Sequence, residues 1–352
     1  MGEVIFCKTN DGSVGLYNES VNDIYHSSYG AYGEGLEKFI LASDFHKFIK
    51  EHDNVNVLDI CYGIGYNTKI AIDEILKNGK SINANFDCLE YDENLITISP
   101  LLKNQKIDNF INLHLIENSN LKISMSVFQI LKFIIEARGI SCINWSNLLK
   151  MCEIYHNSDM FLYLSAKINA FLHNIYYNYI TQRNKKGQKS SILDKISVKF
   201  HSSDARTSVL TLDRKYDFIF LDAFTPKKLP TLWSFEFLKV LYDLLNDNGV
   251  LVTYSSSASV RSALVDIGFY IGKSLDSNGK IIGTIATKNK SLIKNELNDF
   301  EKELLSTTAG VYYRDENLSD TPENMIKRRD NEALNSGRKT SSRLKKDYAK
   351  KL

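Results

Sequence analysis

The chain has 352 residues, of which 43% are hydrophobic and 24% are charged, a composition typical of a soluble globular protein. No apolar run reaches the roughly 20 residues that span a bilayer, and the first residues lack a signal-type segment. We therefore expect a cytoplasmic protein. The five cysteines are scattered without a Cys-x-x-Cys pair, which argues against a disulfide framework and against a zinc site.

The net charge of +2 hides an uneven distribution. Residues 327–352 contain ten Lys or Arg and three Asp or Glu, so the rest of the chain is about five units negative. A basic end of this kind is most often solvated and flexible. It becomes informative about function only if the substrate is a polyanion.

The chain begins with a pattern typical of a β-hairpin. Residues 4–6 and 14–17 are apolar, and the turn signal Asn-Asp-Gly at 10–12 lies between them. Residues 25–34 are rich in Tyr, Ser and Gly without hydrophobic periodicity, which indicates either a surface loop or a lid. The spacing of apolar residues over 36–51 predicts one helix that covers the start of the core sheet.

A strand, a glycine turn and a helix follow. Residues 55–60 read as a buried strand, and the helix is expected over 68–77. Gly63 and Gly65 allow a sharp bend and a close approach of a ligand to the backbone. The helix start presents unpaired N–H groups to that ligand. This is the first unit of a nucleotide-type α/β fold.

The spacing of this loop restricts its ligand. Asp-x-x-x-Gly-x-Gly, starting at Asp59, lacks the third glycine or the Gly-Lys-Ser/Thr of phosphate-binding loops. It is therefore either a plain βα turn or a site for S-adenosylmethionine, which carries no phosphate. Two acids favour the second reading. Glu90, which ends a strand over 83–90, can accept both ribose hydroxyls, and Asp204, after a third strand, can lie near the adenine edge.

The alternation of strands and helices stops after about residue 118. Residues 119–195 have helical spacing and many aromatics, which predicts an all-helical insertion. Its tyrosine cluster at 176–179 is read as core or helix contact, with base stacking as the alternative. We divide the chain into 1–118 (hairpin, lid and first half of the domain), 119–195 (insertion), 196–290 (second half) and 291–352 (basic C-terminal extension).

The second half completes an α/β domain. Strands are expected over 196–201, 216–222 and 250–254, helices over 93 onward, 234–245 and 258–267, a turn over 246–249, and a closing hairpin over 269–274 and 281–287. The near-continuous apolar run at 216–222 indicates a central strand covered on both faces. A mainly parallel sheet that ends in an antiparallel hairpin is the arrangement of class I, Rossmann-like methyltransferases.

Asp222 is the candidate for the chemistry. Because ligands bind beyond the carboxyl ends of the strands in an open α/β sheet, Gly63, Glu90, Asp204 and Asp222 are expected to converge. Methyl transfer to an amine needs alignment and a lone pair free of its proton. A carboxylate at Asp222 can hold the amine and take that proton. The alternative is that Asp222 only caps a helix or a turn.

Several stretches together resemble a known family. They are the lid Tyr25-His26-Ser27 with Gly30-Ala31 and Glu34, the loop Gly63-Ile64-Gly65-Tyr66-Asn67, the run Asp222-Ala223-Phe224-Thr225-Pro226-Lys227-Lys228 leading to Leu232-Trp233, then Thr253-Tyr254, and Tyr312-Tyr313-Arg314-Asp315 with Arg328-Arg329. The chain resembles the MnmC-like methyltransferases, which complete the 5-methylaminomethyl group on the wobble (2-thio)uridine of tRNA. The resemblance covers most of the chain and is weakest in the insertion.

The resemblance implies S-adenosyl-L-methionine as cofactor, tRNA as partner and a 5-aminomethyl uridine as acceptor. The catalytic residue would be Asp222. The cofactor-binding residues would be Tyr25, Ser27, Glu34, Asp59, Gly63, Gly65, Asn67, Glu90, Asp204, Ala205 and Asp222. The residues that meet the substrate tRNA would be Phe224, Lys227, Lys228, Arg314, Arg328 and Arg329.

Two other functions stay open from the sequence. One is a methyltransferase of the same fold that acts on a small-molecule amine or a polyamine, which gives the basic end no role. The other is a non-catalytic relative that binds RNA. The sequence does not determine which tRNAs are used, whether the acceptor is 2-thiolated, or the oligomeric state.

Overall fold

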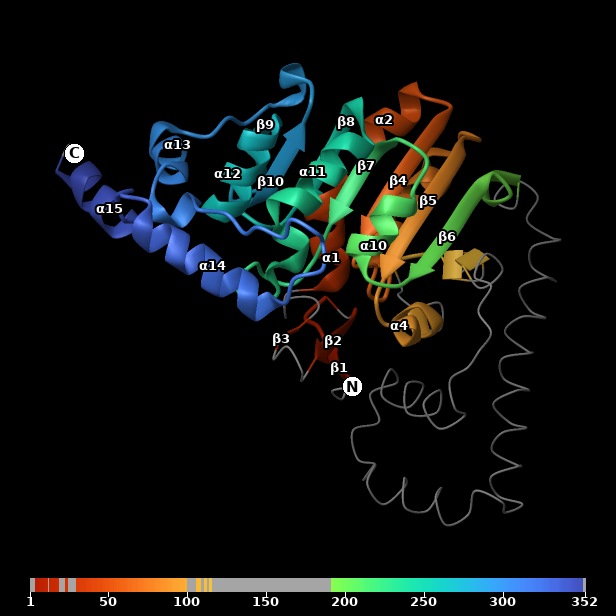
Figure 1. Ribbon diagram of the computed structural model, residues 1–352. Helices are drawn as coiled ribbons and strands as arrows, with labels where there is room; N and C mark the ends of the chain where they lie inside the picture. Colours follow the sequence, from red (N-terminus) through yellow and green to blue (C-terminus); the bar gives the residue numbers. More distant parts are fainter. Residues whose placement is uncertain are drawn as a thin grey trace, which may run out of the picture.

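Seven strands form the central sheet of the computed structural model, which describes residues 4–11, 13–18, 23–24, 30–99, 106–108, 111–112, 114–115 and 191–350. The strands are β4 (Asn54–Ile60), β5 (Asn83–Glu90), β6 (Ile196–Ser202), β7 (Tyr216–Leu221), β8 (Leu245–Thr253), β9 (Tyr270–Leu275) and β10 (Ile281–Thr287). Their spatial order is β6-β5-β4-β7-β8-β10-β9 (Figure 1).

The pairing of these strands confirms the mixed sheet predicted from the sequence. β6, β5, β4, β7 and β8 are parallel to their neighbours, whereas β10 pairs antiparallel with β8 and with β9. The chain moves from β4 outward to β6, then returns to the other side of β4 for β7. The order therefore reverses between β4 and β7, and in open α/β sheets ligands bind at the carboxyl ends of such a pair.

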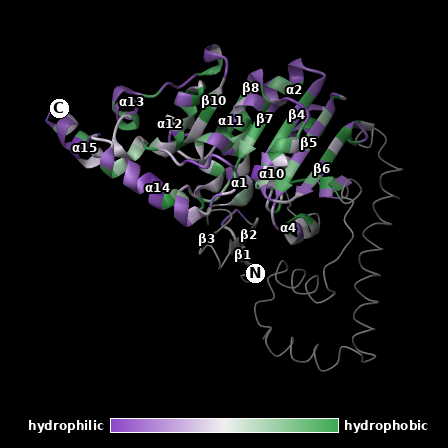
Figure 2. Cartoon of the chain, viewed as in Figure 1, coloured by the Kyte–Doolittle hydropathy of each residue, from purple (hydrophilic) through white to green (hydrophobic). Residues whose placement is uncertain are grey.

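Alternate residues of β7 face the two sides of the sheet. Phe218 and Phe220 pack in the cluster with the N-terminal helices, and Ile219 and Leu221 pack in the opposite cluster with the later helices. All four are at most 2% exposed. The prediction of a central strand covered on both faces is confirmed, and Figure 2 shows hydrophobic residues along the central strands.

The helices that cover the sheet agree with most of the predicted ranges. They are α3 (Tyr66–Asn78), α4 (Glu93–Ile98), α10 (Ala205–Ser208), α11 (Phe235–Leu244) and α12 (Ala258–Ile267). Ser234 caps α11 by accepting from Phe237 N at 3.2 Å, and Gly268 ends α12 in the left-handed conformation with φ 115°. Most of the predicted helical insertion lies outside the described residues.

The N-terminal hairpin is confirmed, with one addition. β1 (Val4–Lys8) pairs antiparallel with β2 (Val14–Asn18), and β2 also pairs with a two-residue strand, β3 (Asp23–Ile24), which the sequence did not predict. These three strands form a small separate sheet.

The prediction of one helix over residues 36–51 is wrong. The segment holds α1 (Ala31–Gly35), the π-helix η1 (Leu36–Leu41) and α2 (Phe45–Glu51), with a break at Asp44, whose φ is 57°. α1 also shows that the end of the expected loop at 25–34 is helical; residues 25–29 lie outside the described part. Phe39, Ile40, Phe45 and Ile49 are nevertheless buried in the core.

The turn expected at 246–249 is a bulge inside β8. Tyr216 pairs with Leu245, and two residues later Phe218 pairs with Val250, so β8 uses five residues where β7 uses two. A Cβ on Gly249 would lie 2.8 Å from the carbonyl oxygen of Tyr216, which explains the glycine at this close approach.

The basic C-terminal extension is folded. It contains α13 (Asp299–Leu305), α14 (Pro322–Asn335) and α15 (Ser341–Ala349), and Figure 1 shows α14 and α15 running in one line along the side of the domain. Met325 of α14 is fully buried in the cluster that contains Trp233 and Tyr313. The excess of positive charge over residues 327–352 had suggested a solvated, flexible end. Within the described residues, no helix is long and apolar enough to cross a membrane.

Candidate active site

The loop after β4 is built from unusual backbone conformations. Cys61, Gly63 and Gly65 have φ values of 64°, 56° and 80°, and α3 begins immediately afterwards. A Cβ on Gly65 would collide with the ring of Tyr62, so only glycine fits there. Cys61 holds a left-handed conformation that costs a non-glycine residue about 1 kcal/mol or more. No pattern in the sequence indicates this strain.

A buried polar network supports the loop from below. The Tyr62 hydroxyl and Ser99 Oγ are 2.8 Å apart, and Ser99 Oγ donates to the carbonyl oxygen of Ile64 at 2.7 Å. Lys69 Nζ donates to the carbonyl oxygen of Ser99 at 2.6 Å, and burial lowers the pKa of Lys69 to about 7. Sequence reasoning missed Lys69, because a lysine in a helix ordinarily points to solvent.

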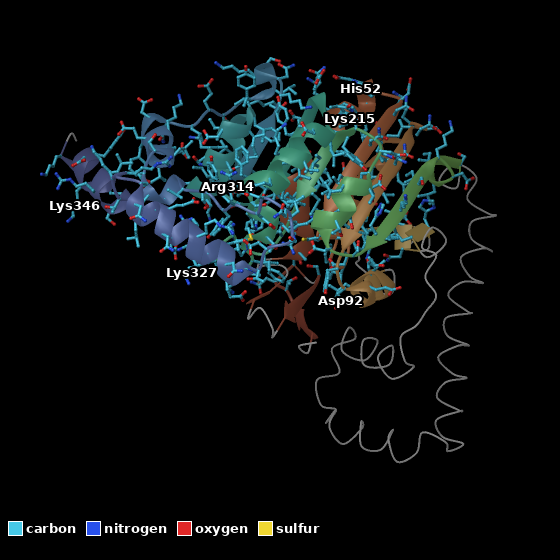
Figure 3. All side chains as sticks on the ribbon, viewed as in Figure 1. His52, Asp92, Lys215, Arg314, Lys327 and Lys346 are labelled. Carbon is cyan, nitrogen blue, oxygen red and sulfur yellow. The ribbon has the colours of Figure 1, made fainter. Side chains whose placement is uncertain are left out.

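Glu90 lies beside the glycine loop, which agrees with the predicted convergence of Gly63 and Glu90. Its Oε2 accepts from Gly63 N at 2.8 Å and its Oε1 accepts from Asp92 N at 3.0 Å. Burial raises the pKa of Glu90. A carboxylate is the kind of acceptor that can bind vicinal hydroxyls. Tyr91, which the sequence analysis passed over, is 80% exposed beside it. In Figure 3, Asp92 marks this edge, while His52 and Lys215 lie at the opposite edge.

Asp59 lies under the loop. It is fully buried, and its Oδ2 accepts from Thr68 Oγ1 at 2.6 Å, whereas its Oδ1 has no hydrogen-bond partner among the described residues. Burial raises the pKa of Asp59 to about 7, and the negative charges of Asp222 and Glu90 add to the effect. Three carboxyl groups therefore share a small region beneath and beside the glycine loop.

Asp222 follows β7 directly and faces the start of α3. Its Oδ2 accepts from Asn67 Nδ2 at 3.0 Å, and its backbone N donates to the carbonyl oxygen of Ile60 at 3.2 Å. Burial raises the pKa of Asp222 to about 6, which the Asn67 hydrogen bond and the charge of Lys38 partly offset, while Glu34 adds to it. Asn67, predicted to bind cofactor, thus contacts the predicted catalytic carboxylate.

Glu34 is paired with a residue that the sequence analysis missed. Its Oε1 lies 2.9 Å from Lys38 Nζ, one helical turn away, and both side chains are half-buried. The Lys38 ammonium also lies 5.7 Å from the ring centre of Tyr254. The pair brings one negative and one positive group near Asp222.

Two hydrogen bonds fix the loop that follows Asp222, which we call the acceptor loop (residues 223–233). Trp233 Nε1 donates to the carbonyl oxygen of Phe224, and the Tyr254 hydroxyl donates to that of Ala223, both at 2.7 Å. The Trp233 and Tyr254 rings meet edge to face at 6.2 Å, and Trp233 is fully buried. Lys227 and Lys228, predicted to contact tRNA, are exposed on this loop.

Asp204 follows β6 and begins α10, whose Ala205 packs in the same apolar cluster as Ala223 and Trp233. Its Oδ1 accepts from Arg206 N at 2.9 Å, so Asp204 caps the helix, and its Oδ2 accepts from Arg206 Nη2 at 2.8 Å. Its side chain remains 36% exposed. Ala205 is buried in the following turn.

The three arginines predicted to contact tRNA make intramolecular contacts. Arg314 Nε lies 2.6 Å from Glu236 Oε1, Arg328 Nη1 donates to the carbonyl oxygen of Arg314 at 2.8 Å, and Arg329 Nε donates to that of Val311 at 2.8 Å. Their role in RNA binding stays a prediction. Tyr25 and Ser27 lie outside the described residues, and their cofactor role also stays a prediction.

Comparisons with known proteins agree with this geometry. Residues 166–289 match the family described as S-adenosyl-L-methionine-dependent methyltransferase. The structure of MnmC2 from Aquifex aeolicus has the same fold, with a TM-score of 0.66 and 21% identity over 95% of this chain and 86% of that one. An uncharacterized protein of Methanocaldococcus jannaschii is 28% identical over 330 residues, 93% of this chain and 72% of the relative.

Two further relatives carry a functional name. The tRNA 5-methylaminomethyl-2-thiouridine biosynthesis bifunctional protein MnmC of Campylobacter hominis is 22% identical over 266 residues, 75% of this chain and 30% of that protein. The protein of the same name from an Azoarcus species is 33% identical over 86 residues, 24% of this chain and 14% of that protein. The chain thus spans less than a third of the length of these two relatives.

Residues 166–289 therefore match S-adenosyl-L-methionine-dependent methyltransferases in sequence, and the sheet is that of a Rossmann-like α/β domain. More particularly, the chain is similar in fold to MnmC2 and in sequence to MnmC proteins, which confirms the resemblance drawn from its sequence.

The cofactor of this family, S-adenosyl-L-methionine, fits the residues present. Gly63 and Gly65 hold positive φ values at the start of α3, and the Glu90 carboxylate beside them is an acceptor of the kind that binds ribose hydroxyls. Such a loop can hold a nucleoside that brings no phosphate.

Proposed function

We propose that the protein transfers a methyl group from S-adenosyl-L-methionine to the 5-aminomethyl group of the wobble uridine in tRNA. The observation that carries the proposal is the Asp222 carboxylate at the point where the strand order reverses. Within the described part of the chain, Asn67 is its only side-chain hydrogen-bond partner, and the glycine loop lies on the adjacent strand. The residue assignments below belong to this proposal.

In this proposal Asp222 acts as a general base that takes a proton from the acceptor amine. When bound, S-adenosyl-L-methionine supplies an electrophilic methyl group on a sulfonium. A primary alkylamine is largely protonated near neutral pH, so the enzyme must remove a proton before the nitrogen lone pair is free. With a pKa of about 6, Asp222 is mostly ionised at pH 7 yet basic enough to take part in this transfer. Asn67 fixes the plane of the carboxylate.

The surroundings of Asp222 suit a cationic acceptor. Glu34 adds a second carboxylate, and Lys38 pairs with it at 2.9 Å, which limits the net negative charge before the substrate enters. An incoming ammonium group can be attracted by both carboxylates. The acceptor loop, held by Trp233 and Tyr254, then places the uracil ring of the substrate beside Asp222. Phe224, near the start of this loop, is half-buried.

The distribution of exposed positive charge supports a polyanionic substrate. α15 and the turn before it present Arg338, Lys339, Arg343, Lys345 and Lys346, all exposed, against one acidic residue, Asp347. Figure 3 shows Lys346 near the end of the C-terminal extension and Lys327 nearer the central sheet. We assign contacts with the tRNA phosphates to this face and to Lys227 and Lys228. The basic end of the chain then serves to bind tRNA.

The test is an assay of the purified protein with radiolabelled S-adenosyl-L-methionine and three acceptors. These are tRNA that carries 5-aminomethyl-2-thiouridine, the same tRNA without the aminomethyl group, and spermidine. We expect 5-methylaminomethyl-2-thiouridine, identified by nucleoside mass spectrometry, from the first tRNA only. Methylation of spermidine with inert tRNA would instead establish the small-amine function, and no methylation with intact cofactor binding would favour the non-catalytic one.

The role of α15 is tested with charge variants rather than truncation, because Leu344 is buried and Tyr348 packs edge to face on Phe300. Replacing Lys345, Lys346 and Lys350 with glutamine is expected to raise the KM for tRNA about ten-fold and to flatten its salt dependence. Replacing the remote Lys80 and Lys215 with glutamine is the matched control and is expected to change neither.

A further inference from the structure

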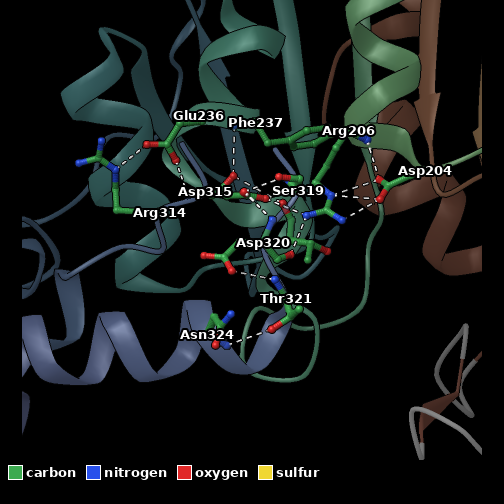
Figure 4. A network of polar contacts seen from close by, with 12 residues as sticks. Asp204, Arg206, Glu236, Phe237, Arg314, Asp315, Ser319, Asp320, Thr321 and Asn324 are labelled. Atoms are coloured by element: carbon green, nitrogen blue, oxygen red, sulfur yellow. Dashed lines mark hydrogen bonds and ion pairs between the residues drawn. The ribbon is translucent and has the colours of Figure 1, made fainter. Parts of the chain in front are cut away.

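A short segment of the C-terminal extension connects the two sides of the site. We call residues 312–320 the strap. Asp315, which is 1% exposed, organises it: Oδ1 accepts from the backbone N of Ser319 at 2.9 Å and of Asp320 at 3.0 Å, and Oδ2 accepts from Arg206 Nη1 at 2.8 Å. Figure 4 shows Asp315 between Arg206 and Asp204 on one side and Glu236 and Arg314 on the other.

Arg206 joins the strap to Asp204. Its Nε and Nη2 donate to Asp204 Oδ2 at 3.1 and 2.8 Å, while its Nη1 donates to Asp315 and to the carbonyl oxygen of Asp320 at 2.9 Å. The Arg206 side chain is 13% exposed. A planar guanidinium fixed on both sides sets the orientation of a carboxylate more closely than an ammonium would. The Asp204 carboxylate therefore has its plane set by the strap, 109 residues further along the chain.

The strap is also anchored on the acceptor side. Phe235 N donates to the carbonyl oxygen of Tyr313 at 2.9 Å, and Glu236 accepts from Asp315 N at 2.7 Å and from Arg314 Nε at 2.6 Å. These residues begin α11, directly after Trp233, which holds the acceptor loop. The strap is thus rigidly attached at the far end, so that Arg206 cannot shift without breaking buried charge-assisted hydrogen bonds.

We propose that Arg206 is a positioning residue for the methyl donor: it holds the Asp204 carboxylate where it accepts from the exocyclic amino group of the adenine, and the strap holds Arg206. The C-terminal extension is then part of the cofactor site in addition to any contact with RNA. The inference rests on the proposed placement of the adenine edge at Asp204. It does not depend on which molecule is methylated.

The test compares two ligands by calorimetry on the full chain. S-adenosyl-L-homocysteine has the amino group on its purine, and S-inosyl-L-homocysteine has a carbonyl oxygen in its place. The wild-type protein is expected to prefer the first. In Arg206→Lys, we expect its affinity to fall about ten-fold with little change for the inosyl ligand, so the preference collapses. Arg214→Lys is the control: Arg214 Nε lies 3.4 Å from Asp87 Oδ2, and Arg214 is not part of the strap. This variant is expected to bind both ligands with the affinities of the wild type.

Three results would overturn the inference. If the wild-type protein binds both ligands equally well, Asp204 does not contact the amino group of the adenine. Equal weakening of both ligands by Arg206→Lys would make the residue purely structural, and unchanged affinities would give it no role. If Arg206→Lys fails to fold, judged by circular dichroism, Asp315→Asn replaces it and is expected to reduce the ligand preference about three-fold. Because no methyl acceptor is present, failure of the proposed tRNA activity is a separate result.

Discussion

The glycine loop after β4 and the acceptor loop after β7 lie at the ends of adjacent parallel strands, yet they are built in different ways. The glycine loop depends on its backbone: three positive φ angles, a ring beneath Gly65, and a buried network through Ser99 and Lys69. The acceptor loop depends on side chains that reach its carbonyl oxygens from Trp233 and Tyr254.

The difference corresponds to what each loop has to bind. A cofactor of constant shape can be held by a backbone whose conformation is set once by glycine and by packing. A substrate that reacts must meet a side chain of tuned charge, and Asp222 is that group in the proposed function. Changes in the first loop are therefore expected to act on cofactor affinity, and changes in the second on the rate of methyl transfer. The following experiments separate the two.

The largest effect is expected from Asp222→Asn. The amide keeps the shape of the side chain but cannot accept a proton, so kcat for tRNA methylation is expected to fall about 10³-fold. The affinity for S-adenosyl-L-homocysteine, measured by calorimetry, is expected to stay within about three-fold of wild type. A variant with near-normal kcat would show that Asp222 is not the base.

Gly65→Ala, in contrast, is expected to lower the affinity for the cofactor. The new Cβ would collide with the Tyr62 ring at a backbone φ of 80°, so the loop must shift and cofactor affinity is expected to fall about 10²-fold. Gly79→Ala is the matched control, because Gly79 has a φ of 70° but no atom within 4 Å of the added Cβ. The control is expected to lose about 1 kcal/mol of unfolding free energy with unchanged cofactor affinity. Similar affinities for both variants would show that the loop does not contact the cofactor.

The pH dependence of kcat reports on Asp222. Because burial raises its pKa to about 6, the carboxylate becomes protonated and inactive as the pH falls through 6, and kcat is expected to drop about ten-fold for each further unit. In Asn67→Leu the charged form loses a hydrogen bond, so the pKa rises and the acid limb is expected to move to higher pH. An unmoved limb would mean that another group controls the rate.

The smallest effect is expected from Trp233→Phe. The phenylalanine fills most of the space but cannot donate to the carbonyl oxygen of Phe224, so the acceptor loop is less well fixed. We expect kcat/KM for tRNA to fall about ten-fold at most, with cofactor affinity unchanged. Tyr216→Phe, which removes a 2.9 Å hydrogen bond to Asp87 at the start of β7, is the control for the loss of one polar contact elsewhere. A loss of cofactor affinity in Trp233→Phe would contradict the separation of the two loops.

The basic helix α15 and the strap differ in the same way within the C-terminal extension. In α15 the cations point to solvent, whereas Arg314 of the strap is paired with Glu236, and Arg328 and Arg329 of α14 donate to backbone carbonyl oxygens. A count of positive charge treats these two kinds of residue as equal. The cytoplasmic location, the helical insertion and the RNA contacts remain predictions from the sequence.

The sequence by itself determined the strands of the sheet, the glycine loop, and the carboxylates at the strand ends. Each of these depends on local patterns: an apolar run for β7, paired glycines after β4, and a turn signal between β9 and β10. The resemblance to MnmC-like methyltransferases rested on short contiguous stretches of the same kind. Periodicity and turn chemistry act over a few residues, so one sequence suffices to read them.

Only the tertiary structure decided the left-handed Cys61, the π-helix at η1, the bulge in β8, and the partners of the charged side chains. Arg206 and Asp315 are 109 residues apart, and Asn67 and Asp222 are 155 apart. Whether such groups meet depends on strand order and on how the helices pack over the sheet. Those are set by the burial of the whole core, and so the sequence alone could name the carboxylates but not the residues that orient them.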